Sequence, residues 1–95
     1  MGINEEKYKE SRKLLLDYLR QTAREKGITH LTIAEKTGFT ANNVSRMLQG
    51  RYSPGLDNFI RLAEAVNCYF FIIDKDADDE LVETMKNRWG AIEEN

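Results

Sequence analysis

The first quarter of the chain has apolar residues at helical spacing. Asn4 can cap a helix at its start, and Gly27 can end it after about Lys26. Tyr8, Leu15 and Thr22 recur every seven residues and therefore share one side of this helix. Together with their neighbours on that side they should face a core: Leu14, Tyr18, Leu19 and Ala23. Basic residues on the other faces are most simply solvated surface charges: Lys9, Arg12, Lys13 and Arg20. The pattern predicts one long N-terminal helix.

A short helix is predicted next, over residues 30–37. Thr29 can cap its start, and this register turns Ile33 and Ala34 inward. Gly38 can adopt a positive φ angle, which suits both the end of a helix and a tight turn. The turn separates this helix from a second helical pattern.

That second pattern predicts a helix over residues 41–49, preceded by Phe39, which can fill the gap between the two helices. Thr40 can cap it, and Val44 and Met47 then point inward. The opposite face has small, amide, hydroxyl and guanidinium side chains: Ala41, Asn42, Ser45 and Arg46. Asparagine and arginine match the major-groove edges of adenine and guanine, and alanine can touch a thymine methyl group. This face predicts sequence-specific DNA binding.

Residues 50–55 predict a loop, because Pro54 disfavours helical geometry at Ser53. Arg51 supplies charge, and Tyr52 and Ser53 supply hydroxyl donors of the kind that hold a protein in register on DNA. The alternative is an ordinary polar surface loop. The residues beyond it return to helical spacing and predict a fourth helix packed on the first three: Leu56, Phe59, Ile60, Ala63 and Val66.

The run from Cys68 to Ile73 is aromatic and β-branched, apolar on both faces and too short for a helix. It predicts a strand, yet no second strand pattern occurs in the sequence. The simplest partner is a second copy, paired antiparallel about a two-fold axis. An extended tail pressed onto its own helices is the alternative. In the dimer, the strand interface consists of Tyr69, Phe70, Phe71, Ile72 and Ile73.

A last helix can begin at the cap Asp76 and end at Gly90, with acidic residues in its first turn. Its apolar stripe should cover the paired strands, and most of it joins the expected dimer interface as Leu81, Met85 and Trp89. Alternating carboxylates from Asp74 onward resemble the start of a calcium-binding loop. The sixth and twelfth positions lack the required glycine and glutamate, so no metal site is predicted.

Other chemistry is excluded by residue counts. With one cysteine and one histidine, Cys68 and His30, the usual zinc ligand sets cannot be assembled within one chain. Cys68 is most simply a small apolar residue. No nucleophile, base and orienting group can be combined, and no glycine-rich phosphate motif occurs. We therefore expect neither catalysis nor a cofactor.

The 95-residue chain has a net charge of −2, but its charges are unevenly distributed. From Lys7 to Arg61 there are eleven basic and five acidic residues, a net +6, whereas Leu62 to Asn95 has three basic and nine acidic, a net −6. The positive part can meet phosphates while the negative part faces away or meets another protein. No apolar run is long enough for a membrane span and the N-terminus lacks signal-peptide features, so we expect a cytoplasmic protein.

Between residues 29 and 50 the sequence resembles the Cro and phage-repressor type of helix-turn-helix regulators, also called the xenobiotic-response-element (XRE) family. Matching spacing extends from about Leu14 to Phe71. Two positions depart: Leu48, where many members have an acidic or polar residue, and Thr37, where many have an aliphatic one. The resemblance rests on the small, turn and buried positions and on the following segments, which here are Ala34, Gly38, Val44, Ser45-Arg46, Gly50, Pro54 and Leu56.

The resemblance implies that the helix from about Ala41 to Gln49 lies in the major groove. Ala41, Asn42 and Arg46 match the base-reading positions, and Ser45 shares their exposed face. The positions that hold the DNA backbone fall on His30, Thr40 and Asn43, and the loop with Arg51, Tyr52 and Ser53 follows the phosphates. As alternatives, the two asparagines could serve helix capping, and the histidine and Arg46 could be ordinary surface residues.

Together these patterns predict a mainly α fold: a repressor-like helix-turn-helix bundle of four to five helices, with one C-terminal β-strand paired between chains and a terminal helix. Residues 1–67 would form the DNA-binding domain and residues 68–95 its dimerisation element. The expected function is a homodimeric repressor or autoregulator that binds pseudo-palindromic double-stranded DNA. The alternative is an antitoxin-like interaction module, whose acidic segment from Asp74 onward binds a basic protein.

Overall fold

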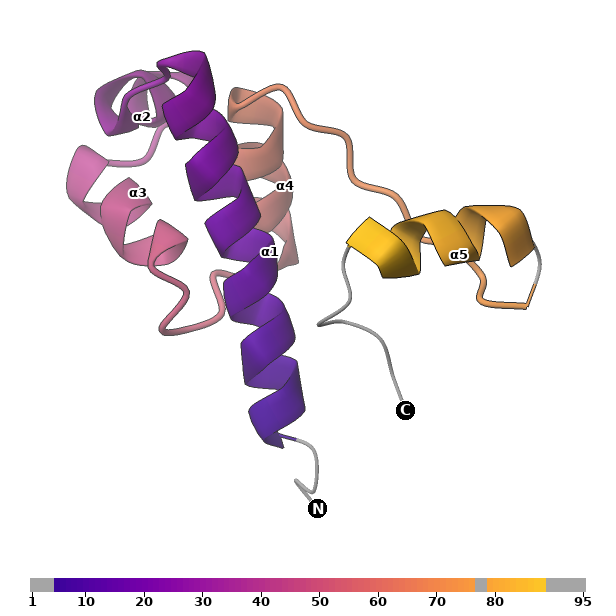
Figure 1. Ribbon diagram of the computed structural model, residues 1–95. Coiled ribbons are helices and arrows are strands. Elements are labelled where there is room, and N and C mark those ends of the chain that lie inside the picture. Colours follow the sequence, from indigo (N-terminus) through magenta and orange to yellow (C-terminus); the bar gives the residue numbers. More distant parts are fainter. Residues whose placement is uncertain (1–4, 77–78, 89–95) are drawn as a thin grey trace.

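The computed structural model describes residues 5–76 and 79–88, which form five helices (Figure 1). The long N-terminal helix, the two short helices and the helix that begins at Leu56 are confirmed. The third ends one residue earlier than predicted, before Gln49. In chain order the helices are α1 (Glu5–Lys26), α2 (His30–Thr37), α3 (Ala41–Leu48), α4 (Leu56–Ala65) and α5 (Asp79–Arg88).

Side chains and a glycine at the predicted caps set the ends of the short helices. Thr29 Oγ1 accepts a hydrogen bond from the Thr32 N–H at 3.1 Å, and Thr40 Oγ1 accepts one from the Asn43 N–H at 3.1 Å. Gly38 follows α2 with a φ angle of +86°, and its N–H bonds a carbonyl of the last turn. Because a residue with a Cβ atom would be strained in this conformation, glycine suits the turn.

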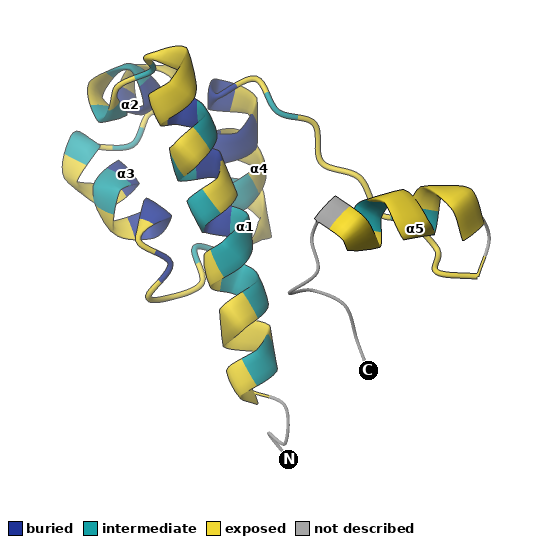
Figure 2. Ribbon diagram, viewed as in Figure 1, coloured by how far each residue is buried: buried dark blue, intermediate teal, exposed yellow. Residues whose placement is uncertain are grey.

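Helices α1 to α4 pack around one apolar core (Figure 2). α2 contacts both α3 and α4, and α1 contacts α3. Removal of aliphatic side chains from water is the main force available to hold such a bundle together. The buried residues come from all four helices and the residue after α4: Leu16, Leu19, Ala23, Ile33, Ala34, Val44, Met47, Leu48, Leu62, Ala63, Ala65 and Val66.

The core-facing stripe predicted on α1 is confirmed at Leu19 and Ala23, which are buried, but its most buried residue was left out. Leu16, which the prediction left out, has only 1% of its surface exposed, whereas Tyr8 and Tyr18 are exposed at 66% and 37%. One residue rotates a helix face by about 100°, so a small error of phase moves a residue out of the core. The first turns of α1 also extend beyond the other helices of the bundle, which cannot cover them (Figure 1).

The core face predicted for α4 was wrong at two positions. Leu56 and Ile60 are exposed, whereas Leu62 joins Ala63 and Val66 in the core. The two exposed residues are four positions apart and therefore share one side of the helix. α4 has apolar residues on more than one side, and packing against α2 decides which side is buried. The bundle thus retains an exposed apolar strip along α4.

The strand predicted over residues 68–73 is not seen, and the described residues contain no strand. A strand needs a neighbour to pair its backbone N–H and C=O groups, and the described part of one chain supplies none. Phe70 packs edge-on against Phe59, with ring centroids 5.2 Å apart. Tyr69 and Ile72 are exposed at 91% and 90%. The segment therefore leaves most of its apolar surface in solvent.

α5 lies apart from α2 and α3, at the end of an extended segment (Figure 1). Leu81 is exposed, and Val82 and Met85 are half-buried. None of the helices in the described ranges is long and apolar enough to cross a membrane. Three residues with roles in the sequence analysis lie outside the described residues: Asn4, Trp89 and Gly90.

Candidate nucleic-acid interface

α2 and α3 are joined by a turn at residues 38–40 that one threonine stabilises. Thr37 Oγ1 donates to the Ile33 carbonyl at 2.8 Å and accepts the Phe39 N–H at 3.2 Å. Phe39 is half-buried against the core, and the Arg61 guanidinium lies 5.8 Å from the centre of its ring. At this position many members of the family that the sequence resembles have an aliphatic residue, which cannot form hydrogen bonds. The Thr37 hydroxyl instead connects the end of α2 with the turn through these two bonds.

The inward face of α3 is more apolar than the family pattern implied. Val44 and Met47 are buried, as predicted. Leu48, one of the two departures from the pattern of the family that the sequence resembles, is also buried, with 3% of its surface exposed. The three side chains fix α3 on the core, so its opposite face has a defined direction.

The predicted base-reading residues lie on the outer face of α3 or at its edge. Asn42 and Arg46 are exposed and four residues apart, so they lie on one side of the helix. Ser45 is half-buried, and Ala41 is half-buried and packs against the core. The exposed amide and guanidinium groups are therefore brought together, whereas Ala41 can offer only part of its methyl group. Base contact by these residues stays a prediction.

The residues predicted to contact the DNA backbone lie at the starts of α2 and α3 and in the following loop. His30 is the first residue of α2 and is half-buried, and Thr40 and Asn43 are exposed around the first turn of α3. Because Thr40 Oγ1 accepts the Asn43 N–H, its own hydroxyl hydrogen is available as a donor. Helix N-termini also favour phosphate groups.

The loop begins at Gly50, which is buried and has a φ angle of +75°. This left-handed residue ends the helical path and redirects the chain toward α4. The three residues predicted to contact phosphates follow directly and are exposed: Arg51, Tyr52 and Ser53. The loop therefore extends the exposed polar surface from the C-terminal end of α3.

Two basic side chains of α1 have structural partners that the sequence analysis missed. Arg12 Nε and Nη2 donate to the carbonyls of Gly50 and Arg51 at 3.3 and 3.2 Å, and Lys26 Nζ donates to the Val66 carbonyl at 2.7 Å. Each places positive charge after the C-terminal end of a helix, where carbonyls lack partners. The prediction of a solvated charge is wrong for Arg12. Its partners are 38 and 39 residues away, so the sequence had no local signal for this contact.

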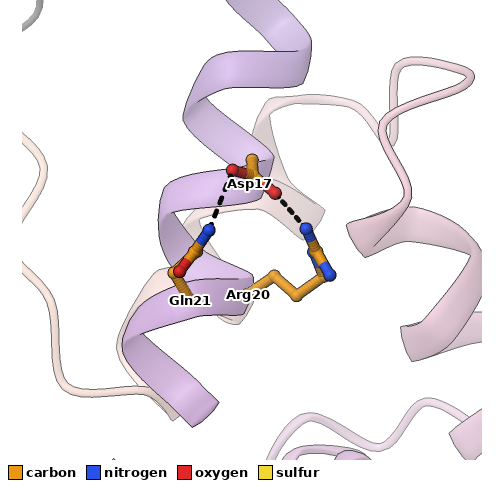
Figure 3. Close-up of polar contacts among 3 residues, drawn as sticks. All are labelled: Asp17, Arg20 and Gln21. Atoms are coloured by element: carbon orange, nitrogen blue, oxygen red, sulfur yellow. Dashed lines mark hydrogen bonds and ion pairs between the residues drawn. The ribbon is translucent and has the colours of Figure 1, made fainter. Parts of the chain in front are cut away.

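Arg20, another predicted surface charge, pairs with an acid on its own helix (Figure 3). Asp17 accepts hydrogen bonds from Arg20 and from Gln21 Nε2, the latter at 3.5 Å. The bond from Arg20 lowers the pKa of Asp17 below its ordinary value. Any stability from this shift is present above the ordinary pKa and is lost as the pH falls through the lowered one. Both side chains are more than a third exposed, so solvent keeps the contribution small.

Beside α4 the structure has an open hollow of about 390 Å³. Its walls are partly apolar and partly polar and are formed by Ile60, Ala63, Glu64, Asn67, Cys68, Tyr69 and Phe70.

No metal site is found among the described residues. Within residues 5–76 and 79–88, no three histidine, cysteine, aspartate or glutamate side chains form a group that could hold a metal ion.

A family model described as a helix-turn-helix domain matches residues 14–68. The matched region runs from the middle of α1 to Cys68 and includes the whole of α2, α3 and α4. It therefore contains the turn, the exposed face of α3 and the loop described above. No curated protein and no solved structure matches the chain.

Proposed function

Because the chain belongs to a helix-turn-helix family that is typical of XRE-like DNA-binding regulators, we propose that it is a homodimeric repressor or autoregulator. In this proposal two copies of α3 enter successive major grooves of a pseudo-palindromic site. The exposed face of α3, fixed by the burial of Val44, Met47 and Leu48, is the observation that supports it best.

Within each half-site, Asn42 and Arg46 would read base edges. Both side chains can donate and match purine edges, and both are exposed on one side of α3. Ala41 and Ser45 would add contacts at the edge of that face. The residues proposed to hold the phosphates lie around it: His30, Thr40, Asn43, Arg51, Tyr52 and Ser53.

The proposed dimer would use the apolar surface that a single chain leaves exposed. Leu56 and Ile60 on α4 are exposed, as are Tyr69 and Ile72 after it. Ile60 and Tyr69 both line the hollow beside α4, so the helix and the segment form one continuous surface. A second copy of residues 69–73 would supply the missing strand partner about a two-fold axis. α5 would cover the pair with Leu81, Met85 and Trp89.

Selection from a random pool of duplexes, at a fixed and stated salt concentration, tests this function. We expect enrichment of a sequence with two inverted half-sites whose centres lie about 34–36 Å apart, or a multiple of that distance. A folded protein that enriches no sequence would contradict specific recognition. Enrichment of a single half-site without symmetry would contradict the two-fold arrangement.

A second function, binding of a basic partner protein, is favoured by the charge of the C-terminal part. Asp76, Asp79 and Glu80, around the start of α5, are exposed, and α5 lies apart from α2 and α3 (Figure 1). Copurification of a stoichiometric basic protein, lost when Glu80→Lys and Glu83→Lys are combined, would support this role. A dimer that binds its DNA site alone would weaken it.

A further inference from the structure

Arg12 is bound to the backbone of the segment that leaves α3. Its Nε donates to the Gly50 carbonyl at 3.3 Å and its Nη2 donates to the Arg51 carbonyl at 3.2 Å. A guanidinium group is planar and presents its donors in a fixed geometry, so one side chain can hold two consecutive carbonyls. These bonds connect α1 with the first two residues of the loop.

The backbones of α1 and the loop also meet directly at Gly50. A Cβ atom built on Gly50 would lie 3.2 Å from Lys13 Cα and 3.2 Å from Lys13 Cγ. The φ angle of +75° further favours glycine at this position. Close packing and the Arg12 hydrogen bonds therefore act on the same point of the chain, the exit from α3.

A second side chain holds the far end of the loop, where Asn58 Nδ2 donates to the Pro54 carbonyl at 3.0 Å. Between these two anchors, the side chains of Arg51, Tyr52 and Ser53 are exposed. In the part of the chain that the structure describes, no hydrogen bond or ion pair engages these three side chains. Their direction therefore depends on how the loop backbone is held.

We propose that Arg12 is a positioning residue for DNA binding. It holds the carbonyls of Gly50 and Arg51 so that the side chains of Arg51 and Tyr52 meet the phosphate backbone, and it does not contact DNA itself. This role rests on the DNA-binding function proposed above for the loop. Because Arg51 carries the charge that Arg12 positions and Tyr52 adds only a hydroxyl contact, loss of Arg12 should weaken binding much less when Arg51 is absent.

A double-mutant cycle tests the dependence of one residue on the other. The full chain is prepared with Arg12→Gln, with Arg51→Gln and with both changes. Lys13→Gln is the matched control, since it removes one positive charge from the next position of α1 while glutamine keeps the Cα, Cβ and Cγ atoms that lie against Gly50. Dissociation constants are measured by fluorescence anisotropy on a duplex of mixed sequence at several salt concentrations, because contacts to phosphates do not depend on base sequence. Circular dichroism gives the folded fraction of each variant.

We expect Arg12→Gln to weaken binding by about fivefold in the natural sequence and by less than about twofold in the Arg51→Gln protein. Lys13→Gln should weaken binding less than Arg12→Gln does. Independent losses, with a salt slope lowered by about 0.9 for each of the two arginines, would show that Arg12 itself contacts a phosphate. That result, an equal loss in Lys13→Gln, or unchanged affinity of folded Arg12→Gln would overturn the proposal.

Arg12→Lys provides a second test if Arg12→Gln does not fold. Lysine is a good phosphate ligand but lacks the planar fork that holds two carbonyls. We expect Arg12→Lys to weaken DNA binding by about threefold, whereas an unchanged dissociation constant in this variant would contradict the positioning role.

The failure of this proposal and the failure of the proposed function give different results. If the folded protein without substitutions binds no duplex at all, the DNA-binding function fails and the positioning role fails with it. If the natural protein binds and the arginine losses are additive, the positioning role alone fails.

Discussion

Arg46 and Arg51 are both exposed, but they lie on a helix and in a loop that would meet different parts of the DNA. Arg46 lies on the outer face of α3, so Arg46→Ala should cost about 1–3 kcal/mol on the selected site and relax the preference at one base position. Arg51 lies in the loop, so Arg51→Ala should weaken binding to all sequences alike. Affinities for the site and its single-base variants distinguish the two. Equal losses on every sequence for Arg46→Ala would refute its base-reading role.

Gly50 and Gly38 both have positive φ angles, but only one of them lies against another helix. A Cβ atom at Gly38 would meet nothing within 4 Å, whereas at Gly50 it would meet Lys13 at 3.2 Å. Gly38→Ala should therefore cost about 1 kcal/mol from backbone strain alone, and Gly50→Ala about 2–3 kcal/mol from strain and crowding. Urea unfolding measures both free energies. Equal losses would mean that α1 can shift to accommodate a Cβ atom at Gly50 without crowding.

At the scale of elements, the helices could be predicted wherever their ends depend on nearby residues. Thr29, Thr40 and Gly38 form their caps with partners three or four residues away, so the bounds of α2 and the start of α3 followed from the sequence. The buried faces of α1 and α4 were less predictable. Leu16 is buried and Leu56 is exposed because of how the helices pack, which is a property of the whole bundle.

The candidate site, too, could be predicted from the sequence only in part. The exposed positions of Asn42 and Arg46 follow from the register that Thr40 sets, and they could be predicted from α3 alone. The roles of Arg12 and Lys26 could not, because each bonds a carbonyl at least 38 residues away. The helix spacing places these side chains on a face of α1, but it does not tell which helix end lies beside them.

The turn between α2 and α3 should depend on the Thr37 hydroxyl. Thr37→Val keeps the shape of the side chain but removes the donor to the Ile33 carbonyl and the acceptor for the Phe39 N–H. We expect a loss of about 1–2 kcal/mol, since the Phe39 N–H is left without this partner. Thr22→Val, on a half-buried face of α1, is the matched control and should change the free energy of unfolding less. Equal changes would exclude a special role for the turn hydroxyl.

At the scale of the whole molecule, the proposed dimer rests on the apolar surface that a single chain leaves exposed. Ile72 is 90% exposed, so Ile72→Glu should leave the fold of each chain intact while placing two like charges in the proposed interface. We expect the dimer dissociation constant to rise at least about tenfold, as measured by analytical ultracentrifugation. Tyr8→Glu changes another exposed apolar residue outside that interface and should leave the constant unchanged. An unaffected dimer in Ile72→Glu would place the interface elsewhere.

Hydroxyl-radical footprinting of the protein on its selected duplex tests the central claim most directly, because it reports which sugars of the DNA backbone each bound copy shields. Two copies in successive major grooves should give two protected segments related by a two-fold axis, with centres about 10–10.5 base pairs apart or a multiple of that spacing. Arg46→Ala should weaken both segments together. A single protected segment on the selected duplex, or no protection by folded protein, would contradict the proposed paired recognition.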